Sequence, residues 1–352
     1  METKKKILSM GVPLLSVVLA FLVGAIIISA LGASPKDALV YLFQGAFGST
    51  TNIGNTLVKA TPLIFTGLCA CFAYRCGVFN LGGEGQFIMG SVAAIWVATS
   101  WGFEGKGAAI AALLVGLLAG GIWGAIPGLL KVLRGLNEMI VSIMLNYVAT
   151  LFMGYIYTLV LREGSVPQTL PVPDATKLTR IIPGMRATTG LVMALVLALA
   201  IYYFLFYTSK GFQLRAVGLN PTASRFNGFP INKFILASFV VSGAIAGLGG
   251  AAELLGTQFR LMSGYGLGFG FDGVAIALIA QRNPIATVLV AYFFAVLRVG
   301  ATTMQVGAGV PTSVIEIIQA LVIVFAVAGT ALVRLPEIQQ LLLSRAANKE
   351  EK

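Results

Sequence analysis

Long stretches without charge dominate this chain and restrict what it can fold into. Residues 7–31 form an uncharged run of 25 residues, and further apolar runs recur almost to the C-terminus. About 20 consecutive apolar residues suffice for a helix to cross a bilayer. Only 11% of the 352 residues are charged, against about a quarter in a typical soluble domain. The sequence therefore predicts an all-α, polytopic membrane protein with about ten transmembrane helices.

The net charge of +11 raises the question of whether the chain binds nucleic acid. Its basic residues are scattered between apolar runs and gather on no single face, so we expect no nucleic acid partner. The chain has no histidine, the most common general base and a frequent metal ligand. We therefore expect no catalytic residue, no metal and no cofactor on this chain, and a membrane enzyme is disfavoured.

The distribution of lysine and arginine predicts the orientation. With the N-terminus inside and about ten crossings, 15 Lys and Arg residues fall on inner segments and eight on outer segments or span ends. Both termini are then cytoplasmic, in a multi-pass protein of the cell membrane. A cleaved signal peptide is the alternative for residues 7–31, but this run is longer than the usual apolar core. Residues 34–47 are predicted to form an amphipathic helix on the outer surface.

A polar, basic segment at 209–233 interrupts the apolar runs with the sequence SKGFQLRAVGLNPTASRFNGFPINK. It contains four basic residues and no acidic one. Asn220-Pro221 favours a turn, 222–226 is long enough for one or two helical turns, and Gly228 before Pro230 ends them. We interpret this segment as a cytoplasmic docking helix for a soluble partner. An ordinary basic inner loop is the alternative.

Two glycine-rich breaks, 77–86 and 259–270, suggest an internal repeat. Glu84-Gly85 and Asp272-Gly273 each begin an apolar helix, at an offset of 188 residues. The predicted orientation makes the two copies inverted, and paired glycine-interrupted segments in inverted halves indicate a transport pathway. One transmembrane domain is expected, made of a first helix and outer helix (1–54), repeat 1 (55–161), an outer loop and sixth helix (162–208), the coupling loop (209–233), repeat 2 (234–333) and a cytoplasmic tail (334–352).

Polar side chains within these apolar segments are candidates for lining the pathway, because an unpaired charge in the membrane is costly. Glu84 and Asp272 have an alternative role as helix caps, and the asparagines have one as links between helices. Glycines also recur every four residues at 116, 120, 124 and 128, which predicts a face that another helix approaches closely. The candidate pathway residues are Asn80, Glu84, Asn137, Glu138, Asn146, Asp272 and Glu316.

The chain resembles the inner-membrane permease of an ABC importer in four segments: GVFNLGGEGQFIMG (77–90), NEMIVSIMLNYVA (137–149), AVGLNPTASRFNG (216–228) and GFDGVAIALIAQRNP (270–284). The similar family serves branched-chain amino acids and simple sugars, and within it the nucleoside branch is nearest. The resemblance covers 55–333 and implies a ten-helix fold of the type II importer permeases. It also implies that the coupling helix carries Gly218, Asn220, Ala223, Arg225 and Gly228.

The resemblance implies several partners. These are a cytoplasmic ATPase, a second permease subunit in a heterodimer, an extracellular substrate-binding lipoprotein, membrane lipid and a small-molecule solute. Gly105-Lys106-Gly107 is followed by alanine, so this chain has no phosphate-binding loop and ATP is expected on the partner. Nucleosides are the expected solute and simple sugars the second choice. An ion-coupled secondary transporter, with Glu84, Asp272 or Glu316 carrying a proton, is the alternative from another class.

Overall fold

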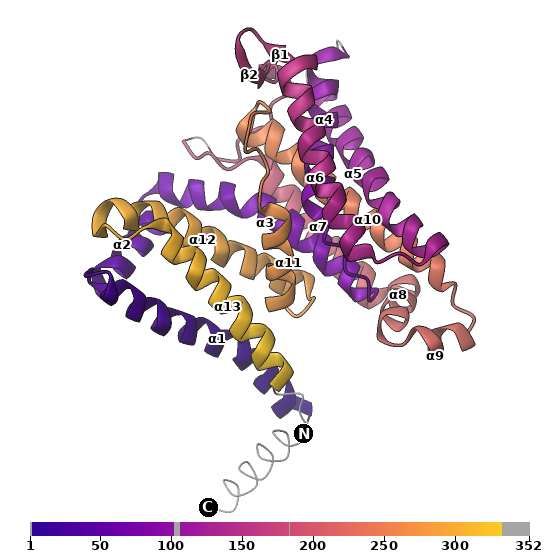
Figure 1. Cartoon of the computed structure of the whole chain (residues 1–352), viewed down its shortest axis with the longest axis horizontal. Helices are drawn as coiled ribbons and strands as arrows, with labels where there is room; N and C mark the ends of the chain where they lie inside the picture. The colour runs from indigo at the N-terminus through magenta and orange to yellow at the C-terminus, as the bar shows by residue number, and fades with distance from the viewer. Residues whose placement is uncertain (1, 102–105, 183, 333–352) are drawn as a thin grey trace, which may run out of the picture. The chain divides into compact units, whose positions relative to one another are not determined.

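The computed structural model describes residues 2–101, 106–182 and 184–332, which are largely helical (Figure 1). The predicted tail, 334–352, lies outside the described residues. The α-helices are α1 (Glu2–Ala30), α2 (Pro35–Phe47), α3 (Thr50–Arg75), α4 (Gly83–Ser100), α5 (Lys106–Arg134), α6 (Glu138–Tyr155), α7 (Thr189–Tyr207), α8 (Ser209–Leu219), α9 (Pro221–Phe226), α10 (Ile231–Glu253), α11 (Phe269–Ile279), α12 (Pro284–Ala308) and α13 (Thr312–Leu332).

The remaining elements are short. Two π-helical turns, η1 (Ile156–Val160) and η3 (Leu254–Gln258), continue α6 and α10, and η2 (Asp174–Thr176) is a 3-10 turn. Strands β1 (Arg162–Glu163) and β2 (Val166–Thr169) pair as an antiparallel hairpin. This composition confirms the all-α, polytopic prediction.

Seven helices among the described residues are long and apolar enough to cross a membrane: α3, α5, α6 with η1, α7, α10 with η3, α12 and α13. An eighth span is counted if α1 and α2, which meet at a bend of 117°, are taken as one pair. The other two predicted crossings correspond to α4, with 18 residues, and α11, with 11. Each of the predicted crossings therefore contains a helix, although α11 is too short to span a bilayer alone.

The helix predicted at 34–47 is confirmed as α2. Ser34 is its N-cap, and the Ser34 hydroxyl accepts a hydrogen bond from the Asp37 amide at 3.3 Å. Pro35 follows at the first helical position, where its missing N–H is not needed. Its place on the outer surface stays a prediction.

The chain divides into two compact units, which are described separately. The terminal unit comprises the described residues of Met1–Gly48 and Leu297–Lys352, and the central unit is Ser49–Val296. The first boundary falls close to the predicted start of repeat 1. The second falls inside α12, so the segment predicted as repeat 2 is shared between the units.

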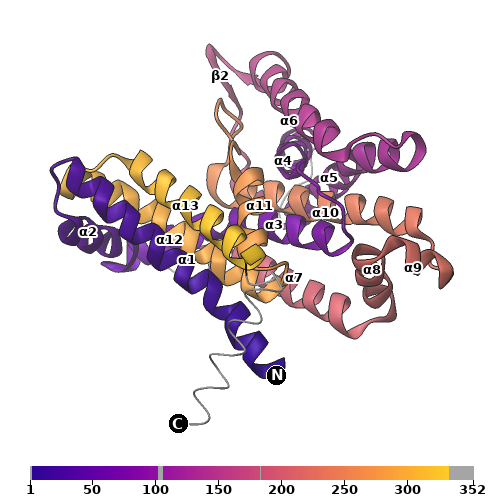
Figure 2. The same ribbon diagram turned by 60° about the horizontal axis from the view of Figure 1, so that its bottom comes forward.

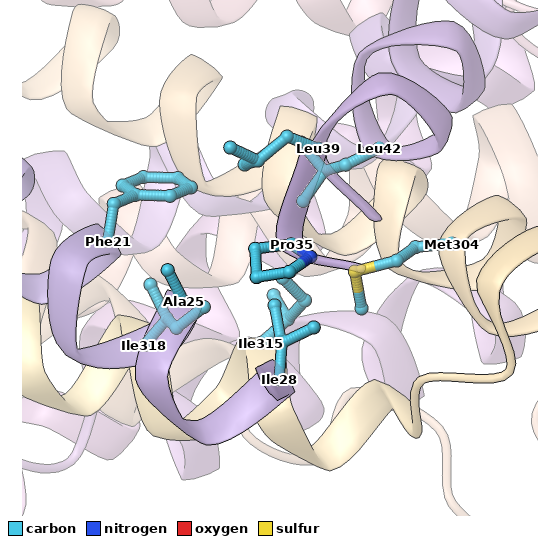
Figure 3. Close-up of a pocket in the computed structure, with 9 residues that line it drawn as sticks. All are labelled: Phe21, Ala25, Ile28, Pro35, Leu39, Leu42, Met304, Ile315 and Ile318. Atoms are coloured by element: carbon cyan, nitrogen blue, oxygen red, sulfur yellow. The ribbon is translucent and has the colours of Figure 1, made fainter. Parts of the chain in front are cut away.

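The terminal unit is held together by apolar contacts. Gly24 of α1 lies against Ile318 of α13, and Gly300 of α12 lies against Leu42 of α2. A void of about 10 Å³ between these helices is lined only by apolar residues (Figure 3). It is about the size that one water molecule needs, so it is no solute site. Its lining consists of Phe21, Ala25, Ile28, Pro35, Leu39, Leu42, Met304, Ile315 and Ile318.

Helix α10 is the centre of the central unit, and α4 and α5 pack along it (Figure 2). The predicted glycine face on α5 meets a second one on α10. A Cβ atom built on Gly120 would lie 2.6 Å from the Gly247 Cα, and one on Gly247 would lie 2.7 Å from the Gly120 Cα. The two backbones are therefore in direct contact, which confirms the prediction of a close helix approach.

Different segments lie at the two ends of α10: α8 and α9 at its start, and the β1–β2 hairpin at its end (Figure 1). At its start α10 follows α8 and α9. At its end the β1–β2 hairpin and the loop after it pack on 255–262, where the Thr169 amide donates to the Leu261 carbonyl at 3.1 Å. Arg260 and Glu163 form an ion pair at the same place. The predicted outer loop therefore packs on the C-terminal end of α10 and on the residues that follow it.

Candidate functional site

The two glycine-rich breaks meet in the central unit. A Cβ atom on Gly270 would lie 2.7 Å from the Glu84 Cα, so only glycine permits this approach. Glu84 is buried, and its Oε2 accepts a hydrogen bond from the Gly268 amide at 2.9 Å. Gly268 is the N-cap residue of α11. The Glu84 carboxylate thus lies at the positive end of a helix that belongs to the other predicted copy.

Asn146 fastens the first break to α6. Its Oδ1 accepts a hydrogen bond from the Gly85 amide at 2.9 Å, and its Nδ2 donates to the Leu81 carbonyl at 2.9 Å. Both ends of the side-chain amide therefore bind backbone groups of the break. This arrangement fits the helix-linking alternative for Asn146 and fixes the path of residues 81–85.

Asn80 lies within the same break and forms hydrogen bonds to other residues of the break and to α10. Its Oδ1 accepts from the Gly82 amide at 2.9 Å, and its Nδ2 lies 2.8 Å from the Ser242 Oγ of α10 and 3.0 Å from the Gln86 Oε1. Asn80 is almost completely buried. Because a buried amide is costly unless it is hydrogen-bonded, this network stabilises one conformation of the break.

Glu138 and Asn137 lie at the junction of α5 and α6. Glu138 Oε1 is 2.5 Å from Lys131 Nζ, so this carboxylate is paired. Asn137 is the N-cap of α6, and its Oδ1 accepts from the Met139 amide at 2.9 Å. Both residues have structural partners at the start of a helix, where acids and asparagine are favoured.

The remaining two candidates differ in their surroundings. Asp272 is half-buried in the first turn of α11, and its charge acts on Glu84. Glu316 belongs to the terminal unit, where it is exposed on α13. The structure thus gathers Asn80, Glu84, Asn146 and Asp272 around the two breaks, and it places Asn137 and Glu138 at the α5–α6 junction.

Glu253, a carboxylate in the last turn of α10, was not predicted as a site residue from the sequence. Glu253 is only 3% exposed, and its Oε1 accepts from Gln258 Nε2 at 3.3 Å. Its Oε2 is buried and has no hydrogen-bond partner among the described residues. Lys59 of α3 is the cation whose charge acts on it. A sequence signal existed, because Glu253 is the only acid between Asp174 and Asp272 and lies in an apolar run.

The helix predicted at 222–226 is confirmed as α9, and its docking role stays a prediction. Asn220 is its N-cap, and the Asn220 Oδ1 accepts a hydrogen bond from the Ala223 amide at 2.9 Å. Gly228 follows the helix with φ +75°, a left-handed conformation that favours glycine. The residues predicted to start and end this helix therefore do so.

Segment α8–α9 exposes apolar and basic side chains together. Leu219 is 86% exposed and Phe226 is 89% exposed, and Arg225 is also exposed. Contiguous exposed apolar patches are typical of surfaces that contact a protein partner or a membrane. A groove of about 390 Å³ is lined by Phe212, Arg215, Ala216, Leu219, Asn220, Ala223, Ser224, Asn227 and Phe229.

Helix α8 is seated directly on the end of α3. A Cβ atom on Gly218 would lie 2.8 Å from the Cys76 carbonyl carbon and 2.9 Å from the Gly77 nitrogen. Gly77 has φ +78° and begins the first glycine-rich break. The segment around α9 is therefore in backbone contact with the residues that lead to Glu84.

Basic residues also surround a pocket of about 200 Å³ at the other end of α10, lined by Lys177, Leu178, Arg180, Arg186, Thr188, Gly256, Thr257 and Phe259. Lys177 Nζ lies 2.5 Å from the Asp174 Oδ1 and holds the pKa of that exposed carboxyl below its usual value. Within the described ranges, no group of three or more acidic or cysteine side chains is arranged to hold a metal ion.

Comparison with known proteins identifies several relatives. The chain is 36% identical to the guanosine ABC transporter permease protein NupP of Bacillus subtilis strain 168, over 93% of this chain and 96% of the relative. It is 34% identical to the glucose ABC transporter permease protein TsgB13 of Haloferax volcanii, over 90% of this chain and 87% of the relative. It is also 34% identical to the nucleoside ABC transporter permease protein NupB of Lactococcus lactis subsp. cremoris, over 96% of both chains.

No solved structure matches this chain. Residues 52–327 match the family described as the branched-chain amino acid transport system / permease component. This range includes both glycine-rich breaks, α8 and α9. The chain therefore belongs to the family of branched-chain amino acid transport system permease components.

Proposed function

We propose that this multi-pass membrane protein is the permease subunit of an ATP-driven importer of nucleosides. The observation that supports this most directly is the α8–α9 segment, a short capped helix with exposed apolar and basic side chains in backbone contact with the end of α3. Such a segment can pass a movement from a soluble partner to the first glycine-rich break. The chain performs no covalent chemistry in this proposal, since ATP is bound and hydrolysed on a separate subunit.

The proposal includes three protein partners and one orientation. A cytoplasmic ATPase binds α9, a second permease subunit completes the pathway as a heterodimer, and an extracellular lipoprotein delivers the solute. Both termini are cytoplasmic. The 15 basic residues counted on inner segments include Arg75 and Arg282. These two lie together, with the Arg75 Nε 2.6 Å from the Arg282 carbonyl oxygen. This contact supports the relative placement of these segments.

Nucleosides are proposed as the solute because two of the three relatives described above are named for guanosine or nucleosides. The glucose permease, at 34% identity, makes a simple sugar the second candidate. A competition assay separates the two: uptake of labelled guanosine by the assembled transporter should be reduced by unlabelled uridine or adenosine and not by glucose or ribose. Competition by the sugars alone would reverse the assignment.

The experiment that tests the importer assignment is purification of the tagged chain from membranes of its own cell, followed by reconstitution. An ATPase subunit and a second permease should accompany it, and nucleoside uptake should require ATP and persist when the proton gradient is collapsed. Uptake that fails without a proton gradient and ignores ATP would favour an ion-coupled transporter.

The orientation and coupling are tested at α9. A cysteine placed at Thr222 should react with an impermeant reagent only from the cytoplasmic side. Arg225→Glu should reduce ATP-driven uptake while the protein still inserts, because Arg225 is exposed on the proposed docking surface. Labelling only from outside, or unchanged uptake by the Arg225 variant, would contradict the coupling assignment.

A further inference from the structure

Three arginines from segments far apart in the sequence lie close together, one of them in α8. Arg75 ends α3, Arg215 lies in α8, and Arg282 lies in the turn between α11 and α12. The Arg75 and Arg215 guanidinium groups both lie over the Phe206 ring, at 5.2 Å and 4.9 Å from its centroid. The charges of Arg215 and Arg282 both act on Arg75. We call these three residues the arginine cluster.

Among the residues that the structure describes, no acidic side chain pairs with the arginine cluster. No acidic residue occurs in 38–83, 175–252 or 273–315, which contain all three arginines. Each ion pair identified among the described residues involves other side chains. The Nε of Arg215 is buried without a hydrogen-bond partner in the described part of the chain. Adjacent like charges with a buried, unpaired donor are unfavourable, so the cluster is poised to receive an anion.

The groove between α8 and α9 gives access to this cluster. Arg215 is its only basic lining residue, and most of the other lining side chains are apolar. The groove opens beside Leu219, whose side chain is exposed. Its volume of about 390 Å³ exceeds the roughly 30 Å³ of one water molecule by an order of magnitude. An acidic side chain flanked by apolar residues matches this lining in both charge and polarity.

Contacts of the arginine cluster also connect the groove to segments of both predicted repeats. Gln281 and Arg282 have φ values of 51° and 60°, and such left-handed non-glycine residues are held in place by their surroundings. One of these contacts is the bond from Arg75 Nε to the Arg282 carbonyl, at 2.6 Å. An anion at Arg215 therefore acts on the end of α3 and on the turn before α12 together.

We propose that the α8–α9 groove receives an acidic side chain of the ATPase subunit, whose carboxylate pairs with Arg215. This inference rests on the proposed function, because it assumes that α9 docks on an ATPase. A protein carboxylate is favoured over a lipid phosphate because the groove lies on the segment proposed to dock, where Leu219, which lines the groove, and Phe226 of α9 are both exposed. The same docking event then buries the apolar surface and neutralises the arginine cluster.

The test measures binding of the co-purifying ATPase subunit to reconstituted permease heterodimers that carry wild-type or variant Arg215. Arg215→Met should weaken binding about tenfold or more, which corresponds to about 1.4 kcal/mol. It should also reduce the dependence of binding on salt, since one ion pair is lost. Arg134→Met is the matched control: it removes an exposed arginine at the end of α5, outside the segment 209–233, and binding should stay within about twofold of wild type.

Two further variants keep the result interpretable if Arg215→Met folds poorly. Arg215→Lys retains the charge and should bind better than the Met variant, and Arg215→Glu should be rescued by one acid-to-lysine substitution on the ATPase. Equal ATPase binding by all Arg215 variants would overturn the proposal. A loss of ATPase binding that occurs only in vesicles containing anionic lipid would also overturn the proposal, because it assigns the site to a lipid headgroup. If deletion of residues 335–352 reproduces the loss, the site belongs to the tail and the proposal is likewise overturned. Absence of any ATPase binding by wild type would instead refute the proposed function.

Discussion

Gly218→Ala tests whether α8 transmits force to α3 through direct backbone contact. The added Cβ would lie 2.8 Å from the Cys76 carbonyl carbon and 2.9 Å from the Gly77 nitrogen, and closer still to the Arg75 carbonyl oxygen. Carbon atoms in favourable contact are about 3.5–4.0 Å apart, so α8 must move away from α3 by roughly 0.7 Å or more. Overpacking of this kind costs about 1–3 kcal/mol.

The expected result is a partial loss of coupling. ATP hydrolysis by the reconstituted transporter should continue while the number of nucleosides imported per ATP falls, and the melting temperature of the permease should decrease. Gly107→Ala is the matched control, because a Cβ at Gly107 meets nothing within 4 Å and its backbone is not left-handed. If Gly218→Ala matches Gly107→Ala in both the transport ratio and the melting temperature, the contact does not transmit the movement.

Three further predictions follow from hydrogen bonds and ion pairs. Asn220→Ala removes the N-cap of α9 and should destabilise that helix by about 1 kcal/mol, seen as about fivefold faster amide exchange in 221–226; unchanged exchange would contradict the capping role. A double-mutant cycle with Lys131→Met and Glu138→Gln should give a coupling energy of about 1 kcal/mol, since the pair is partly exposed; a coupling of zero would contradict the pair. Glu84→Ala should lower the free energy of unfolding by about 1–3 kcal/mol, because the Gly268 amide loses its acceptor, and Glu84→Gln should lower it less. If both variants lose nucleoside uptake equally, the negative charge itself is needed in the pathway.

Local patterns in the sequence were sufficient to predict the helices and α9. Asn220 before a proline and Gly228 after Phe226 define α9 through short-range backbone preferences, which a single sequence displays. The glycines of α5 likewise predicted a close helix contact. The sequence did not identify the opposite face, because Gly243 and Gly247 on α10 do not stand out without the fold.

Contacts between distant segments explain what the sequence analysis could not resolve. Asn146 was a candidate for lining the pathway, yet its amide binds the Gly85 backbone, 61 residues away. A polar residue in an apolar helix looks the same in sequence whether it meets a solute or a neighbouring backbone. Glu253 was overlooked because it lies at the end of α10, where a single acid resembles a boundary residue. The three arginines of the cluster are far apart in the sequence, and their proximity became visible only when α3, α8 and the α11–α12 turn were placed together.

The interlocked glycines of α5 and α10 have a consequence for how such a protein moves. Where two backbones touch, no side chain can change rotamer to let one helix slide past the other, so we expect α5 and α10 to travel as one block. These helices come from different predicted copies. A block of this kind joins parts of both predicted repeats, so a boundary between moving parts does not coincide with the boundary between the two predicted repeats.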